Sequence, residues 1–167
     1  MSLTFVILRH AKSDWTDPFQ DDHDRALNSR GRAAALAMGK WLADQGLTID
    51  LALCSTATRA RETWDLTGSA LPQIAEALYL PELYLASAQT LLDVLRKNGR
   101  GGTVAMIGHN PGIGQMAEMV LRAPPDAQNF RRYPTCYATI AKFDQTDWRL
   151  ANWRSASLVA HTGPRDL

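Results

Sequence analysis

Three short apolar segments, each followed by a helical pattern, constrain the fold of this chain more than any other feature. They cover residues 3–8, 50–54 and 103–108, and each has the length and apolar character of a strand buried on both faces. Strands that alternate with helices along a chain form a parallel sheet covered by helices. The sequence therefore predicts an α/β fold whose central sheet is mostly parallel.

The helices are predicted from apolar periodicity and from residues that cap helix ends. They are expected from Asn28 or Ser29 to Gly46, over about 57–70, and from Ser87 to about Asn98. A fourth helix is expected after Asn110 as N-cap, with Pro111 as its first residue.

The remaining segments are predicted to be strands or loops. Residues 137–143 and 149–153 are expected to form two final strands joined by a turn over 144–147. Residues 11–28, 71–86 and 123–135 are predicted to be irregular, and the tail is expected to be ordered only in part. A loop as long as residues 11–28 is usually functional in a compact domain.

Composition limits the classes of function. A chain of 167 residues has the length of one ordinary domain, so we expect residues 1–167 to form a single domain. A net charge of +1 without a basic stripe argues against a nucleic acid partner. No apolar run reaches membrane-spanning length, and two cysteines make no disulfide framework, so we expect no membrane partner and a cytoplasmic location.

Each of the three apolar segments leads into side chains that can bind or attack a phosphoryl group. Arg9 and His10 follow the first, Ser55 and Arg59 follow the second, and His109 follows the third. In open α/β sheets the ligand crevice lies beyond the carboxyl ends of the strands. Two imidazoles and two guanidiniums in one pocket raise the electrostatic free energy unless a dianion binds there. The sequence thus predicts a phosphate pocket.

Arg9 and His10 have the clearest chemical roles. Arginine provides a planar, permanently charged group that matches phosphate oxygens. A neutral imidazole beside it can attack phosphorus and form a covalent phosphohistidine. Neighbouring cations are expected to lower the pKa of His10 below about 6.5, which keeps the ring nucleophilic near neutral pH. The alternative is an ion pair with nearby acids at the end of the strand.

Arg59, His109 and Glu82 are further candidates. Arg59 lies near a helix amino terminus, which favours an anion, but it could also be a surface arginine. His109, in a glycine-rich turn, could donate to a phosphoryl oxygen or be a core histidine bonded to backbone. Glu82, in the loop before the third segment, could protonate a departing oxygen or be an exposed acid.

No motif supports a cofactor or a metal ion. His23 and His161 have no ligand-type spacing, and the sequence contains neither a Walker-type loop nor a Gly-x-Gly-x-x-Gly motif. Trp15 could line the pocket because it follows His10 closely. Cys54 is expected to be a small buried residue.

Taken together, these motifs resemble those of the histidine phosphatase superfamily, the phosphoglycerate-mutase-like group. Within it, they are most similar to the SixA-type phosphohistidine phosphatases. The matching segments are residues 8–13, 24–31, 55–63, 108–111 and 164–167, and they span nearly the whole chain. The resemblance implies a three-layer α/β/α sandwich with a central, mostly parallel sheet.

The resemblance also implies roles for the site residues. His10 would be the phosphorylated nucleophile, and Arg9, Arg59 and His109 would bind and stabilise the phosphoryl group. Glu82 occupies approximately the place of the proton donor in the superfamily. No metal ion or cofactor is expected to take part.

Two positions depart from the pattern of the superfamily. Ala11 stands where many members have glycine, a change that a turn can accommodate. Six residues past the nucleophile the superfamily usually has an asparagine that makes a secondary phosphate contact. This chain has Thr16 there, so the resemblance does not carry that contact over.

The resemblance favours hydrolysis of phosphohistidine on a signalling or phosphotransfer protein. The chain lacks the long helical insertion that covers the pocket in larger relatives, and an open crevice admits a histidine on a protein surface. Hydrolysis of small organic phosphate monoesters is the main alternative. A third possibility is a catalytically inactive module that binds phosphorylated partners. The two histidines argue against it, because recognition alone needs cations and not a nucleophile.

Overall fold

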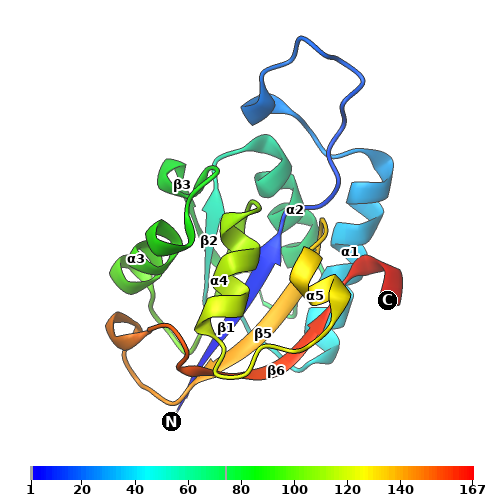
Figure 1. Ribbon diagram of the computed structural model, residues 1–167. Coiled ribbons are helices and arrows are strands. Elements are labelled where there is room, and N and C mark those ends of the chain that lie inside the picture. Colours follow the sequence, from blue (N-terminus) through cyan, green and yellow to red (C-terminus); the bar gives the residue numbers. More distant parts are fainter. Residues whose placement is uncertain (1, 74) are drawn as a thin grey trace.

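The three apolar segments form adjacent strands in the centre of a six-stranded sheet (Figure 1). In this computed structural model, which describes residues 2–73 and 75–167, β2 (Leu51–Ser55), β4 (Thr103–Gly108) and β1 (Leu3–Arg9) lie side by side in parallel. The order of the sheet is β3-β2-β4-β1-β5-β6, and β5 (Ala138–Phe143) alone runs opposite to the other described strands. The prediction of a mostly parallel sheet is confirmed.

Helices cover both faces of this sheet (Figure 1). α1 (Ser29–Asp44) and α2 (Thr58–Ser69) lie on one face; α3 (Ala88–Asn98), α4 (Gly112–Val120) and the short α5 (Gln128–Arg132) lie on the other. The fold is therefore the expected three-layer α/β/α sandwich. Two predicted caps are also confirmed, since the Asn28 side chain accepts from the Gly31 N–H at 2.8 Å and Ser87 from the Thr90 N–H at 3.2 Å.

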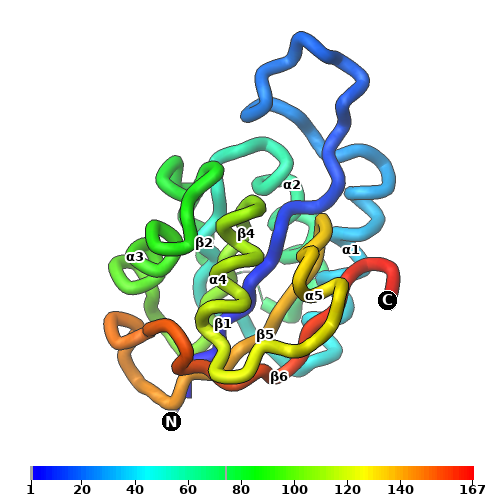
Figure 2. Tube along the Cα trace, in the orientation of Figure 1, coloured from blue at the N-terminus to red at the C-terminus, as the bar shows by residue number. Residues whose placement is uncertain are grey.

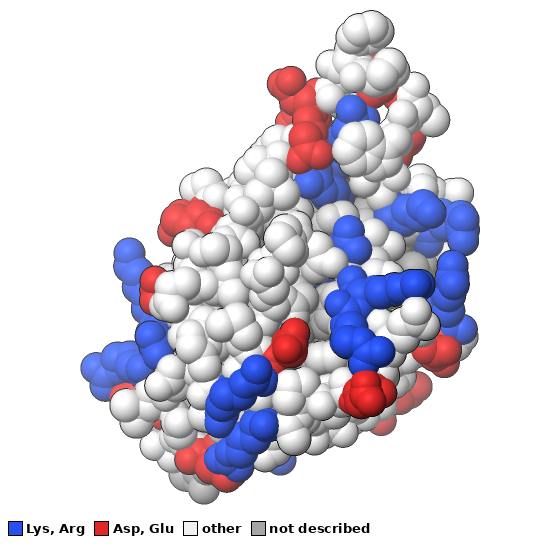
Figure 3. Space-filling view, viewed as in Figure 1, with Lys and Arg blue, Asp and Glu red and all other residues white. Residues whose placement is uncertain are grey.

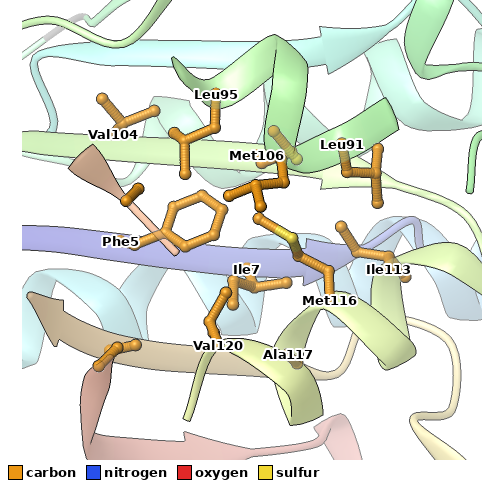
Figure 4. Packing of buried hydrophobic residues seen from close by; sticks show 14 of the residues in the cluster. Phe5, Ile7, Leu91, Leu95, Val104, Met106, Ile113, Met116, Ala117 and Val120 are labelled. Atoms are coloured by element: carbon orange, nitrogen blue, oxygen red, sulfur yellow. The ribbon is translucent and has the colours of Figure 1, made fainter. Parts of the chain in front are cut away.

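Alternate residues of β1 belong to two separate cores. Phe5 and Ile7 pack against α3 and α4 in the cluster of Figure 4, whereas Val6 and Leu8 pack against α1 and α2. All four side chains are at most 1% exposed. Burying a side chain of this type contributes about 1.5–3 kcal/mol to stability. The strand that ends in Arg9 is therefore anchored from both faces of the sheet.

The segment between β1 and α1 projects from the body of the molecule beyond the carboxyl ends of the central strands (Figure 2). Its one short helix is the 3₁₀ turn η1 (Asp22–Asp24). The buried Arg25 guanidinium donates to the carbonyls of Asp17 at 2.9 Å and Gln20 at 3.1 Å, and it stacks on Trp15 at 4.0 Å. These contacts give the projecting loop an internal structure of its own.

Two predicted loops contain regular structure. Residues 71–86, of which Ile74 lies outside the described residues, include the edge strand β3 (Glu76–Leu80) and the 3₁₀ turn η2 (Pro81–Leu83). Residues 123–135 include α5. The fourth predicted helix, α4, begins at Gly112 and has no side-chain cap, although the Asn110 side chain accepts from the Gly114 N–H at 3.2 Å.

The strand predicted over residues 149–153 is wrong. Trp148–Leu150 is a 3₁₀ turn, η3, in which the Asp147 carboxylate accepts from the Arg149 N–H at 2.9 Å. The last strand is β6 (Ala156–Thr162), followed by the 3₁₀ turn η4 (Pro164–Asp166). The expectation of a partly ordered tail is therefore also wrong. None of the helices in the described part of the chain is long and apolar enough to cross a membrane.

Candidate active site

A cavity of about 480 Å³ lies at the carboxyl ends of the central strands. In the register of the sheet Arg9 pairs with Gly108 and Cys54 with Ile107, so the residues that follow these strands meet at one edge. Four of the five predicted site residues line the cavity, namely Arg9, His10, Arg59 and His109. Lys12, Trp15 and Leu85 also line it.

His10 is held so that one ring nitrogen is unprotonated and accepts only a long hydrogen bond from Arg59. Its Nδ1 lies 2.7 Å from the carbonyl oxygen of Ala11. Because a carbonyl oxygen can only accept, Nδ1 carries the proton and donates it, and Nε2 is left unprotonated. Arg59 Nε lies 3.4 Å from that Nε2. The residue is 7% exposed and lines the cavity, so an unprotonated nitrogen that accepts from a guanidinium lies in the wall of the cavity.

The main chain around His10 is tied to three parts of the fold. Its N–H donates to the Gly108 carbonyl at 3.0 Å, and its carbonyl accepts from the Cys136 N–H at 2.9 Å. The next N–H, that of Ala11, donates to Thr63 Oγ1 on α2 at 2.9 Å. Ala11 is fully buried, which agrees with the expectation that this turn accommodates alanine. The imidazole is therefore presented by a rigid backbone.

Ser55 orients the second histidine. Its Oγ accepts from the Ala57 N–H at 3.2 Å and lies 2.7 Å from His109 Nε2. The hydroxyl hydrogen can be donated to Nε2, and in that arrangement the ring proton of His109 lies on Nδ1. That Nδ1 is buried and has no hydrogen-bond partner among the described residues. The His10 and His109 rings have centroids 5.1 Å apart, so in this tautomer an unused N–H donor belongs to the ring next to His10.

Arg59 is held by two residues that the sequence analysis did not single out. Its Nη1 donates to the Asp22 carbonyl at 2.7 Å, and its Nη2 donates to Asp22 Oδ2 at 2.9 Å. The Tyr84 hydroxyl donates to the same Oδ2. Burial acts to raise the pKa of Asp22, but the hydrogen bonds from Tyr84 and Arg59 outweigh it and hold the pKa below its usual value. Arg59 is 4% exposed and is therefore a fixed cation, not a surface arginine.

Arg9 supplies the second cation. Its Nη1 donates to the Tyr133 carbonyl at 3.1 Å, while its Nε is buried without a partner among the described residues. Burial, followed by the charge of Arg59, lowers the pKa of Arg9. The guanidinium nevertheless stays charged at any physiological pH. Two neighbouring cations and unused buried donors indicate a site that accepts an anion.

Both histidines of the cavity are neutral near neutral pH. Burial is the main factor that lowers the pKa of His10. The hydrogen bond to Ala11 opposes this effect, but the charges of Arg59 and Arg9 add to it, and the pKa falls to about 4. Burial, followed by the neighbouring His10 and Arg59, lowers the pKa of His109 to about 3. The direction is the one expected from the sequence.

These neutral histidines predict a loss of stability in mild acid. Their folded-state pKa values of about 4 and about 3 lie below the ordinary value of 6.5. From about pH 6.5 down to about pH 4 the unfolded chain binds more protons than the folded one, so the free energy of unfolding falls as the pH falls. We expect the melting temperature to drop across this window, and to drop less steeply in His10→Gln/His109→Gln. An unchanged slope in the double variant would contradict this account.

The structure does not bring Glu82 into the cavity. Glu82 is exposed in η2 and does not line the cavity, whereas Leu85, three residues later, does. Its role as a proton donor stays a prediction. Trp15 lines the cavity, as the sequence suggested, and Thr16 is exposed outside the lining.

No group of three or more His, Cys, Asp or Glu side chains within residues 2–73 and 75–167 could hold a metal ion. Instead, His23 Nε2 lies 2.9 Å from Thr56 Oγ1, and His161 Nδ1 lies 2.6 Å from the Tyr137 hydroxyl. Cys54 is fully buried, as expected, and burial raises the pKa of its thiol.

The fold and the cavity define a class of protein: an α/β sandwich that gathers two neutral histidines and two buried arginines at the carboxyl edge of its parallel strands. The model of the histidine phosphatase superfamily (branch 1) matches residues 5–87, and the chain belongs to this superfamily. An uncharacterized protein of Mycobacterium leprae is 33% identical over 165 residues, which cover 95% of this chain and 100% of the relative.

Solved structures are similar over almost the full length of the chain. A candidate phosphohistidine phosphatase SixA from Nakamurella multipartitia has a TM-score of 0.83 at 27% identity and covers 98% of this chain and 97% of that one. A candidate SixA from Agrobacterium tumefaciens has a TM-score of 0.76 at 27% identity and covers 97% of this chain and 99% of that one. The predicted resemblance to SixA-type members is confirmed, and it supports a phosphatase-type activity.

Proposed function

We propose that this protein hydrolyses phosphohistidine on a signalling or phosphotransfer protein, without a metal ion, through a covalent phosphohistidine on His10. The observation that carries the proposal is the unprotonated Nε2 of His10, which accepts from Arg59 Nε at 3.4 Å in a cavity shared with Arg9 and His109. An unprotonated imidazole beside two guanidiniums is suited to attack phosphorus. Residues 1–167 would act as one domain, in the cytoplasm.

The reaction would proceed in two displacements. In the first, the lone pair of His10 Nε2 attacks phosphorus, and the bond between phosphorus and the substrate nitrogen breaks. The electron pair leaves with the substrate imidazole, which takes up a proton. In the second, water attacks the phosphorus of phosphorylated His10, loses a proton and releases inorganic phosphate, which restores the neutral ring. Arg9, Arg59 and the His109 Nδ1–H would stabilise the charge on the phosphoryl oxygens in both steps.

The rim of the cavity supports a protein substrate. Trp15 and Leu85 line the cavity and are 64% and 57% exposed, and Phe19 in the projecting loop is 94% exposed. Large exposed apolar side chains grouped around a site are typical of surfaces that contact other proteins. They would support a partner that presents its phosphorylated histidine at the mouth of the cavity.

The alternative is a phosphatase of small organic phosphate monoesters. A cavity of about 480 Å³ has the size of pockets that hold small molecules. The two substrates differ in their leaving groups. The conjugate acid of imidazole has a pKa of about 6.5, whereas an alkoxide is far more basic and needs a proton as it departs.

A single comparison separates the two substrates and tests Glu82. Wild type and Glu82→Gln are assayed on a phosphorylated histidine-containing phosphocarrier and on an alkyl phosphate monoester. If Glu82 donates the proton, we expect Glu82→Gln to lower alkyl phosphate hydrolysis by about 10²-fold and to leave phosphohistidine hydrolysis nearly unchanged. Glu118→Gln, which alters an exposed acid on α4, is the control.

Each result has a distinct meaning. No turnover of the phosphocarrier by wild type would contradict the proposed substrate. Equal losses on both substrates in Glu82→Gln would refute the explanation based on the leaving group, even if the phosphocarrier is hydrolysed.

A further inference from the structure

A second cavity adjoins the first, and the proposed reaction does not use it. Its volume is about 410 Å³, and it shares Lys12, Pro134 and Thr135 with the phosphate cavity. The rest of its wall comes from α1, α5, Tyr137 and residues 163–166. A ligand in the phosphate cavity therefore lies next to this second space, which we call the flanking cavity.

The flanking cavity collects the arginines that have no partner within the protein. Arg30, Arg132 and Arg165 line it, and among the described residues none of their side chains makes a hydrogen bond, an ion pair or an aromatic contact. The other arginines all do. Seven pair with carboxylates, Arg9, Arg25 and Arg154 donate to backbone carbonyls, and Arg61 stacks on the Tyr79 ring.

The backbone fixes where these cations stand. The Asn28 N–H donates to the Lys12 carbonyl at 3.0 Å. A Cβ on Gly31 would lie 2.1 Å from that same oxygen, so only glycine allows α1 to begin this close to residue 12. Arg30 is thereby held in the wall of the flanking cavity, on the helix end that contacts the backbone of Lys12, which lines both cavities. Arg165 belongs to η4, which contacts α1, and Arg132 is the last residue of α5.

The charges of the flanking cavity are not balanced internally. Lys12 adds a fourth cation, and Asp166 is the one carboxylate in the lining, with no ion pair to any of the four in the part of the chain that the structure describes. In Figure 3 the basic side chains gather on the side of this face where α1, α5 and the carboxyl terminus lie. The chain has 17 acids for 18 lysines and arginines, yet these cations remain unpaired. Like charges that line one cleft repel each other and attract an anion from outside.

We propose that the flanking cavity binds the carboxylates of an acidic segment next to the phosphohistidine of the substrate protein. This inference rests on the proposed function, because the phosphohistidine must occupy the first cavity. A peptide that passes Lys12 and residues 134–135 carries its neighbouring side chains over Arg30, Arg132 and Arg165. Guanidiniums bind carboxylates through two parallel hydrogen bonds, so Asp or Glu is expected at these positions.

The test uses two phosphohistidine peptides of equal length, flanked by Glu and Asp in one and by Gln and Asn in the other. We expect wild type to have a kcat/KM about tenfold higher for the acidic peptide, chiefly through KM, since each exposed ion pair contributes modestly and three act together. The preference should shrink as salt is added. Arg30→Gln/Arg132→Gln/Arg165→Gln should lose the preference and hydrolyse the amide-flanked peptide as wild type does.

A matched variant controls for net charge. Arg100→Gln/Arg122→Gln/Arg149→Gln removes three arginines that pair with carboxylates and line neither cavity, and it should keep the preference. Equilibrium binding of the same peptides without phosphate is measured in parallel, and the acidic peptide should bind wild type more tightly than the Arg30 triple variant.

Equal treatment of the two peptides by wild type, in binding and turnover, would overturn the proposal. So would equal losses in the two triple variants. If the acidic peptide binds through the three arginines but neither peptide is hydrolysed, the proposed function fails while the flanking cavity is supported.

Discussion

Replacing His10 with alanine is expected to lower kcat/KM for phosphohistidine hydrolysis by roughly 10⁴-fold or more, because the variant has no atom that can take the phosphoryl group. The unprotonated Nε2 of His10, which accepts only the 3.4 Å bond from Arg59 Nε, cannot be replaced by the other histidine of the cavity. His109 Nε2 lies 2.7 Å from Ser55 Oγ, which occupies that nitrogen with a hydrogen bond. Folding should be retained, since alanine leaves the backbone bonds to Gly108 and Cys136 in place.

The measurement combines steady-state rates with trapping of the intermediate. Wild type is mixed with a substrate labelled in its phosphoryl group and quenched in alkali, where a phosphorus–nitrogen bond survives, or in acid, where it is lost. Label is expected on wild type and on the control His161→Gln, whose histidine lies outside the cavity lining, and not on His10→Ala. Appreciable hydrolysis by His10→Ala would remove the covalent mechanism.

Replacing Arg59 with lysine is expected to lower kcat/KM by about 10²–10³-fold even though the positive charge is kept. Arg59 uses three nitrogens at once: Nε lies beside His10 Nε2, and Nη1 and Nη2 donate to Asp22. An ammonium is a single point of charge and cannot reproduce this planar arrangement. The loss should appear mainly in kcat, because the contact with the phosphoryl group strengthens as negative charge develops.

The matched control is Arg32→Lys. Arg32 also donates to a carboxylate, that of Glu62 at 3.0 Å, but its side chain is 51% exposed and lies outside the cavity. We expect this variant to keep its activity. Melting temperatures of both variants are measured alongside, and wild-type kcat in a folded Arg59→Lys would contradict a role in charge stabilisation.

The central strands could be predicted because several local signals agree there. Each is a continuous apolar run that leads into a helix with a recognisable start, and the helix caps Asn28 and Ser87 were found in the same way. The edge strands were missed because burial does not impose a pattern on them. In β3 the residues are half-buried or exposed throughout, and in β6 Val159 is 54% exposed.

The last strand was predicted over residues 149–153, a segment that follows Trp148 directly and includes Trp153. Aromatic residues favour strands, but the Trp148 ring reaches the core from a 3₁₀ turn, with its centroid 6.3 Å from that of Phe5. Whether an aromatic ring is buried from a strand or from a turn depends on tertiary packing, which is absent from a local pattern.

In the site, too, the residues that follow a local sequence signal could be predicted, and the contacts between distant segments could not. Arg9, His10, Arg59 and His109 could be placed together because each follows a strand whose carboxyl end lies at one edge of the sheet. The contacts of Asp22 could not be found, since Arg59 is 37 residues away and Tyr84 is 62 residues away along the chain. Asp21, Asp22 and Asp24 stand close together in the projecting loop, but nothing in the sequence distinguished Asp22 from the other acids of that loop.

The hydrogen bonds between Asp22 and Arg59 affect the release of inorganic phosphate after each turnover. Nη1 and Nη2 each use one N–H on Asp22, so the guanidinium offers an arriving oxyanion fewer free donors than an unpaired arginine would. A bidentate hydrogen bond would bind the inorganic phosphate product tightly and delay the next turnover. Because Asp22 competes with phosphate for the Arg59 donors, we expect the product to be released more readily than from an unpaired arginine.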